Sequence, residues 1–190
     1  MKLDKSLEPF RAAIESLQQL LNQFNDRGVI IGGVAVGFLG APRFTADIDA
    51  VFLLSINDIH QLITLAQQVD IIPRIPDAED FARKNRVLLF THNPTETDID
   101  ISLGILPFEE EMIERAQTQS FAGLTIRLPT PEDLIIMKAI AHRPKDLNDI
   151  RTIADKHPDL DTHRIEEWVK SFGDALELPD LWEQIKSLIK

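Results

Sequence analysis

The apolar residues of this chain change their spacing near residue 128, and that change limits the folds that it can adopt. Between residues 29 and 128, short apolar runs bounded by glycine, proline and asparagine predict β-strands with helices between them. After residue 128, apolar residues recur only at three- and four-residue steps, which predicts helices alone. This segregation favours an α+β fold, in which a mixed sheet with flanking helices is followed by a helical C-terminal subdomain. We place the core at residues 1–128 and the subdomain at residues 129–190.

The expected elements follow from apolar periodicity and turn residues. Strands are predicted over residues 29–31, 48–54, 87–91, 97–103 and 124–128. Helices are predicted over residues 7–24, 34–39, 55–69, 108–116, 131–142, 146–156, 162–172 and 179–190. Residues 71–83 contain two prolines and several charges, so we expect a loop there with at most one helical turn.

The composition removes several classes of protein. The 190 residues include no cysteine, which excludes disulfides, thiolate zinc sites and cysteine nucleophiles. No apolar run is long enough to span a membrane, and the N-terminal segment lacks the apolar stretch of a signal peptide, so we expect a cytoplasmic protein. The net charge of −11 argues against binding nucleic acid through the global field of the protein. It is compatible with an enzyme that uses Mg²⁺ to hold phosphates.

The segment Asp47-Ile48-Asp49 carries the most chemical information. It begins a predicted strand, and because alternate side chains of a strand share one face, both carboxylates point the same way. Two carboxylates on one rigid face can bind Mg²⁺, which proteins usually hold with one or two carboxylates together with substrate phosphates. The same pattern recurs at 98/100 and 159/161, and we assign the 159/161 pair to capping and solvation of a turn between helices.

The pair Gly32-Gly33 lies shortly before this segment. It follows a predicted buried strand and begins a helix, which leaves backbone N–H groups free at the positive end of the helix dipole. Glycine lets a phosphate approach such backbone closely. An anion site and a cation site in adjacent loops are what a nucleoside triphosphate with Mg²⁺ requires.

The order and spacing of these residues resemble the signature of the DNA polymerase β-type nucleotidyltransferase superfamily. That signature joins a Gly-Gly pair, a spacer and an Asp-x-Asp on a strand, and the matching residues here are Gly32, Gly33, Arg43, Thr45, Asp47 and Asp49. The resemblance implies a nucleotidyltransferase fold, with a nucleoside triphosphate bound at the glycines and Mg²⁺ or Mn²⁺ held by the two aspartates. It also implies that Arg43 and Thr45 belong to the nucleotide-binding site.

A third carboxylate on a later strand is a further implication of the resemblance, and in the superfamily it assists deprotonation of the attacking hydroxyl. Asp100, between two isoleucines, fits this position best, and Asp98 on the same strand face is the alternative. We therefore expect Asp47, Asp49 and Asp100 on neighbouring strands, with carboxylates that converge on a metal.

The second half of the chain is similar, more weakly, to the nucleotidyltransferase toxins of type IV toxin–antitoxin systems. Lys138 begins a Lys-x-x-Ala element, and Asp146 and Asp149 match an Asp-x-x-Asp element. In those toxins the lysine contacts nucleotide phosphates and an aspartate supports the site. The resemblance covers about residues 25–155 and implies the same roles here, with an RNA acceptor and an antitoxin protein as partners. From the residues alone, an exposed lysine and a helix-capping aspartate are the competing interpretation.

Three functions remain open. Transfer of a nucleoside monophosphate to RNA requires a partner protein or a local basic surface, for which Arg83, Lys84 and Arg86 are candidates. Transfer to a small hydroxylated molecule, as in antibiotic-modifying enzymes, is compatible with the acidic composition. A non-catalytic module that binds a nucleotide or a partner would usually lack one carboxylate, and this chain keeps all three. The five histidines have no metal-ligand spacing, and we expect His92, in a predicted hairpin loop, at the surface.

Overall fold

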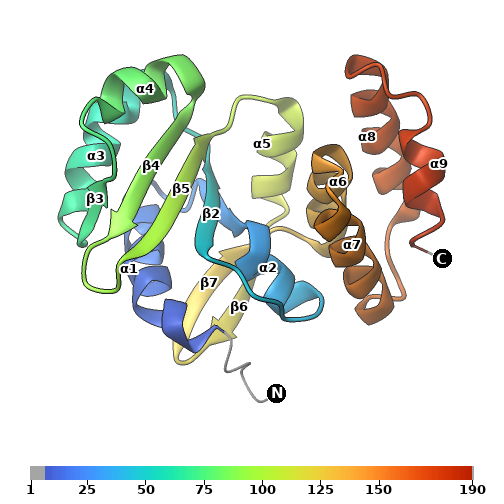
Figure 1. Ribbon diagram of the computed structural model, residues 1–190, viewed down its shortest axis with the longest axis horizontal. Coiled ribbons are helices and arrows are strands. Elements are labelled where there is room, and N and C mark those ends of the chain that lie inside the picture. The colour runs from blue at the N-terminus through green and yellow to red at the C-terminus, as the bar shows by residue number, and fades with distance from the viewer. Residues whose placement is uncertain (1–6, 190) are drawn as a thin grey trace.

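A five-stranded sheet forms the centre of the computed structural model, which describes residues 7–189 (Figure 1). Its strands are β1 (Gly28–Ile31), β2 (Asp47–Phe52), β3 (Ile71–Pro73), β4 (Val87–His92) and β5 (Thr97–Leu103). Their spatial order is β1-β2-β5-β4-β3, in which β2 and β5 run parallel and every other neighbouring pair runs antiparallel. The expected α+β class with a mixed sheet is therefore confirmed.

Helices flank this sheet and make up the last part of the chain. They are α1 (Arg11–Gln23), α2 (Gly32–Leu39), α3 (Ile59–Gln67), α4 (Ala78–Asn85), α5 (Pro107–Glu114), α6 (Pro131–Ala141), α7 (Pro144–Lys156), α8 (Thr162–Ala175) and α9 (Leu181–Lys186), with 3₁₀ turns η1 (Glu8–Phe10) and η2 (Ile56–Asp58). A separate hairpin, β6 (Gln117–Phe121) and β7 (Leu124–Leu128), contacts β1 and α1 through β7.

The last four of these helices lie together beside the sheet, and α6 packs against both α7 and α8 (Figure 1). Helices α2 and α7 are also in contact, which joins this group to the first helix that follows β1. All elements after Leu128 in the described part of the chain are helical. The division into a core and a subdomain at residue 128 stays a prediction.

Alternation along β4 and β5 separates a buried face of the sheet from an accessible one. Leu88, Phe90, Ile99 and Ile101 are fully buried and belong to the hydrophobic core, whereas their neighbours along both strands are half-buried. Since successive side chains of a strand point to opposite faces, the polar residues between these apolar ones gather on the second face. Asp100 is one of them, so the alternation that buries the core residues of β5 also places this carboxylate on the accessible face.

Residues 71–83 differ from the expected loop. Ile71–Pro73 form the edge strand β3, and Ala78–Asn85 form α4. An edge strand can accommodate proline because one of its sides makes no ladder hydrogen bonds. Helix α4 buries Ala78 and Ala82 against the rest of the molecule, and these small residues are a weak apolar signal in a charged segment. These two short elements were not predicted, because the prolines and charges of the segment indicate a loop.

The capping signals in the sequence predict the helix starts well. At the start of α6, the Thr130 hydroxyl accepts a hydrogen bond of 3.3 Å from the backbone N–H of Asp133. Asp161 accepts a 3.0 Å bond from the backbone N–H of Arg164 at the start of α8, which confirms its capping role. The strand β6 was not predicted, because its polar residues 117–120 show no apolar alternation. Within residues 7–189, every helix is too short or too polar to cross a membrane.

Candidate active site

The parallel pairing of β2 with β5 brings four aspartates onto one face of the sheet. Asp47 lies opposite Asp98 and Asp49 lies opposite Asp100 in the strand register. The side-chain period of two then directs all four carboxylates to the same, accessible face. The expected placement of Asp47, Asp49 and Asp100 on neighbouring strands and one face is confirmed.

Gly32 and Gly33 form the first turn of α2, which begins directly after β1, and Ile31 at the end of β1 pairs with Asp49. Gly32 has a φ of +65°, and a Cβ at this position would lie 1.9 Å from Oδ2 of Asp49. A Cβ at Gly33 would lie 2.5 Å from Oγ1 of Thr45. Both glycines are therefore required by close approach, and the first of them also by its backbone conformation.

Neighbouring side chains hold three of the four carboxylates. The Thr45 hydroxyl lies 3.1 Å from Oδ1 and 3.2 Å from the backbone oxygen of Asp47, to both of which it can donate. Arg74, which directly follows β3, donates from Nη2 to Oδ1 of Asp100 over 2.8 Å and pairs through Nη1 with Asp98. These contacts orient Asp47 towards its own loop, and Asp98 and Asp100 towards Arg74.

The two carboxylates in the middle of this face are held at an electrostatic cost. Burial raises the pKa of Asp49 above its usual value, and repulsion from Asp47 and Asp100 raises it further. Burial also raises the pKa of Asp100, although the charge and hydrogen bond of Arg74 oppose the shift. Carboxylates that repel one another in a partly desolvated site are stabilised by a cation placed between them.

The donor set suits a hard divalent cation, because Asp47, Asp49 and Asp100 offer only carboxylate oxygens on adjacent strands. The side chains do not converge as we expected, however. In the described part of the chain, no group of three or more acidic or histidine side chains is placed so that it could hold a metal ion. Two of the three carboxylates have other partners, since Thr45 lies within hydrogen-bond distance of Asp47 and Arg74 binds Asp100.

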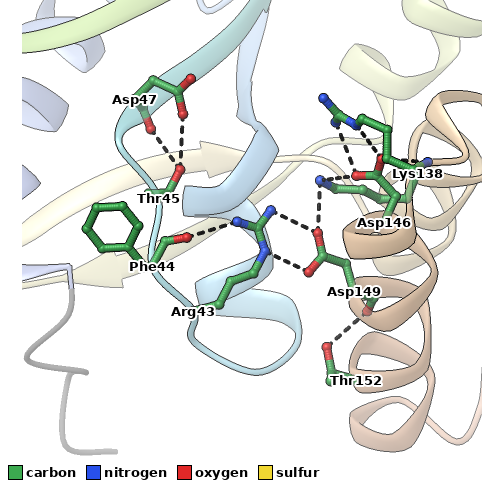
Figure 2. A network of polar contacts seen from close by, with 9 residues as sticks. Arg43, Phe44, Thr45, Asp47, Lys138, Asp146, Asp149 and Thr152 are labelled. Carbon is green, nitrogen blue, oxygen red and sulfur yellow. Dashed lines mark hydrogen bonds and ion pairs between the residues drawn. The ribbon is translucent and has the colours of Figure 1, made fainter.

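A second cluster of charges connects the loop before β2 with α6 and α7 (Figure 2). Arg43 binds Asp149 through two parallel contacts, Nε to Oδ1 at 2.8 Å and Nη2 to Oδ2 at 2.9 Å. Its Nη1 also donates to the backbone oxygen of Phe44 at 3.1 Å. This arginine therefore fixes the loop that carries Thr45 onto the helical part of the chain.

Lys138 lies at the centre of the cluster and is buried, which excludes the interpretation as an exposed lysine. Its Nζ is 3.1 Å from Oδ1 of Asp146 and 3.1 Å from Oδ2 of Asp149. Arg143 also binds Asp146, with 2.6 Å between Nε and Oδ2 and 3.2 Å between Nη2 and Oδ1. Burial alone would raise the pKa of Asp146, but the hydrogen bonds from Arg143 and Lys138 outweigh it and lower that pKa.

A cavity of about 200 Å³ lies between the aspartate face and this charged cluster. Its walls combine glycine backbone, apolar side chains, one carboxylate and two cations, from Ile31, Gly32, Asp49, Leu134, Met137, Lys138, Ala141 and Arg143. Apolar walls with a few convergent charged groups are typical of pockets for small ligands.

Sequence reasoning missed two residues of this region. Arg74 lies next to a three-residue edge strand that was expected to be loop, so nothing in the sequence indicated its position. Arg143 immediately precedes Pro144, a common helix-start arrangement, and that signal indicates a cap without indicating a cavity. The prediction that His92 lies at the surface in a hairpin loop was wrong, because His92 is buried in β4, where its Nδ1 lies 2.7 Å from Oγ1 of Thr95.

Comparisons with known proteins agree with this geometry. Residues 8–171 match the family described as nucleotidyltransferase of unknown function (DUF6036). A search of curated proteins found no match. Among solved structures, an antigenic nucleotidyltransferase-like protein from Paracoccidioides brasiliensis is 19% identical with a TM-score of 0.56, over 96% of this chain and 94% of that one.

Two further structures have related folds. The antibiotic-resistance factor ANT(2'')-Ia, in complex with adenylyl-2''-tobramycin, is 16% identical with a TM-score of 0.56, over 86% of this chain and 97% of that chain. The Megavirus polyadenylate synthase is 11% identical with a TM-score of 0.50, over 82% of this chain but only 34% of that chain. At these identities the similarity establishes the fold, while the family match extends over most of the chain. The chain therefore belongs to this nucleotidyltransferase family and is an enzyme of the nucleotidyltransferase class.

Proposed function

We propose that this protein transfers a nucleoside monophosphate from a nucleoside triphosphate to a hydroxyl group of an acceptor, with Mg²⁺ or Mn²⁺ as cofactor. The observation that carries the proposal is the register of β2 and β5, which sets Asp49 beside Asp100. Next to this pair, the backbone of Gly32 lines the cavity and begins α2. A carboxylate face and a helix N-terminus at one cavity suit a triphosphate with its divalent cation.

Asp47, Asp49 and Asp100 would hold the metal, which supplies charge neutralisation at the phosphates and at the attacking and leaving oxygens when it is bound. The backbone N–H groups of Gly32 and Gly33 donate to phosphate oxygens. Asp100 accepts the proton of the attacking hydroxyl, because it lies on the accessible face beside Asp49. The bond to the α-phosphorus then forms from the acceptor oxygen, and pyrophosphate leaves.

Arg43 and Thr45 act as positioning residues in this proposal. Arg43 holds the loop against Asp149, and Thr45 holds Asp47. Asp146 and Asp149 act through another residue, because they orient Lys138 in the cavity wall. Lys138 would contact the phosphates with the N–H donor that these carboxylates leave unused.

For the acceptor, we propose a small hydroxylated molecule. The accessible face carries four carboxylates, and the whole chain has a net charge of −11, which would repel a polyanion. The candidate basic surface is also weakened, since Arg83 pairs with Glu79 at 2.8 Å and Arg86 donates to the backbone oxygens of Leu103 and Gly104. The similarity to an antibiotic-resistance factor along almost its full length supports the same choice.

An RNA acceptor, with or without an antitoxin partner, is the alternative outcome of one experiment. The full chain is incubated with α-³²P-labelled nucleoside triphosphates, Mn²⁺ or Mg²⁺, and either a panel of aminoglycosides and other polyols or total tRNA. We expect label in a small-molecule product, and no label when Asp49→Asn replaces the wild type. Label in RNA alone would overturn the assignment of a small-molecule acceptor. Label transfer that is unchanged in Asp49→Asn would overturn the assignment of the active site.

Metal dependence has its own test. We expect nucleoside triphosphate to bind weakly in the presence of a chelator, because Asp47 and Asp49 repel a polyphosphate, and to bind more tightly with Mg²⁺. Isothermal titration calorimetry in both conditions measures the difference. Equal affinity with chelator and with Mg²⁺ would contradict a metal-bridged site.

A further inference from the structure

We infer that Arg143 is a polyphosphate-binding residue, and that it carries the one positive charge that the buried cluster around Lys138 leaves unneutralised. The inference rests on the proposed function, since it concerns the same nucleotide. It assigns a binding role to a residue outside the motifs that led to the site. Arg143 is then the cation that contacts the ligand most directly, and Lys138 is the cation that is held inside the cluster.

The balance of charge in the cluster is the first argument. Arg43, Lys138 and Arg143 face two carboxylates, Asp146 and Asp149, so one positive charge remains without a counterpart in the cluster. Each carboxylate is held by two cations, and both carboxylates are buried. Asp49 faces this charge from the same cavity, and the exposed side of the cluster is open to water or to an anion.

The exposure of the three side chains to solvent decides which cation carries the surplus positive charge. The Lys138 side chain is only 6% exposed and lies between both carboxylates, whereas the Arg143 side chain is 57% exposed. Arg43 is engaged along one edge by Asp149 and on Nη1 by the backbone oxygen of Phe44. Arg143 is therefore the cation through which the cluster reaches solvent.

The donors of Arg143 give the second argument. A guanidinium has five N–H donors, and Arg143 uses one on Nε and one on Nη2 to bind Asp146. The remaining three make no hydrogen bond to any residue in the range 7–189. Asp146 also accepts from the backbone N–H of Arg143 at 3.1 Å, so the arginine is anchored at both ends of its side chain.

Location supplies the third argument. Arg143 lines the same cavity as Gly32 and Asp49, and its charge is near enough to Asp49 to influence the pKa of that carboxyl. A planar, anchored guanidinium with free donors matches the geometry of phosphate oxygens, which it can bind in bidentate fashion. The ligand class is therefore the polyphosphate of a nucleotide.

The test measures binding of inorganic tripolyphosphate with Mg²⁺ to the full chain by isothermal titration calorimetry, because this probe lacks the base and sugar. We expect Arg143→Gln to weaken binding about tenfold to a hundredfold, as for loss of a charged hydrogen bond of about 1.5–3 kcal/mol. Arg143→Lys keeps the charge but loses the planar fork, so its affinity should fall between the two. Lys145→Gln is the matched control, because Lys145 is an exposed lysine two residues away that forms no ion pair within residues 7–189, and it should bind as wild type does.

A purely structural role for Arg143, through its hold on Asp146, makes a different prediction. A structural role requires only a cation beside Asp146, so Arg143→Lys should then bind tripolyphosphate as tightly as wild type does. Wild-type affinity in Arg143→Lys or in Arg143→Gln would overturn the inference. Failure of the wild type to bind tripolyphosphate or any nucleoside triphosphate with Mg²⁺ would instead overturn the proposed function together with the inference.

Discussion

Arg74 donates a 2.8 Å hydrogen bond from Nη2 to Oδ1 of Asp100, the carboxylate that lies opposite Asp49 in the parallel strand pair. The same guanidinium binds Asp98 through Nη1. One arginine thus holds both carboxylates of β5 on the face where we place the metal. A divalent cation that takes Asp100 must compete with Arg74, which can keep its contact with Asp98.

Replacing Arg74 with glutamine should therefore tighten the binding of Mn²⁺. The gain should be several-fold, because a half-exposed ion pair contributes at most about 1 kcal/mol. Electron paramagnetic resonance of free Mn²⁺ measures the affinity without any need for an acceptor. Arg83→Gln is the control, since Arg83 pairs with Glu79 on α4, and it should leave the affinity unchanged. Weaker Mn²⁺ binding by Arg74→Gln would show that the arginine organises the site instead of competing for it.

Asp49→Asn should separate stability from catalysis. Transfer of label from α-³²P nucleotide should fall by orders of magnitude, while the melting temperature of the metal-free protein at pH 7 stays level or rises. The reason is that burial and the charges of Asp47 and Asp100 raise the pKa of Asp49, so its ionised form is unfavourable in the folded state. A lower melting temperature together with undiminished labelling would remove Asp49 from the active site.

Lys138→Met should destabilise the protein, whatever its effect on catalysis. The substitution removes the cation that two buried carboxylates, Asp146 and Asp149, share, so each of them loses a charged hydrogen-bond partner. We expect the free energy of unfolding at pH 7 to fall by about 1.5–3 kcal/mol in denaturant titrations. Lys145→Met, at an exposed position on the next helix, should change little. Equal stability of the two variants would mean that the cluster does not depend on Lys138.

His92 should make stability depend on pH between neutral and mildly acidic conditions. Burial lowers its pKa below the ordinary value of 6.5, although Asp70 opposes the shift. The unfolded chain therefore binds a proton more readily than the folded one, so stability is complete above pH 6.5 and is lost as pH falls from there through the folded pKa. The slope from this group is at most about 1.4 kcal/mol per pH unit.

Denaturant titrations of His92→Gln from pH 7.5 down to pH 5 should show a smaller loss of stability than those of the wild type. His60→Gln is the control, because the His60 side chain is 79% exposed, and its profile should follow that of the wild type. Parallel profiles for all three proteins would assign the acid sensitivity to other groups.

Short-range patterns explain why much of the fold could be predicted from the sequence. The apolar alternation of β4 and β5, the Gly32-Gly33 start of α2 and the Thr130 cap of α6 each depend on residues within a few positions of one another. The strand β3 and helix α4 could not be predicted in this way. Three edge residues and two buried alanines become stable only through packing against β4 and α3.

For the candidate site, the shared face of Asp47 and Asp49 follows from their spacing along one strand, because the period of a strand is a local property. The position of Asp100 beside them depends on the packing of the whole chain, since the parallel register of β2 and β5 links segments separated by the whole of α3 and α4. The same holds for Arg74 on Asp100 and for Arg43 on Asp149, two contacts between distant segments. Such ion pairs depend on which elements pack together, and packing is a property of the whole chain that no local spacing encodes.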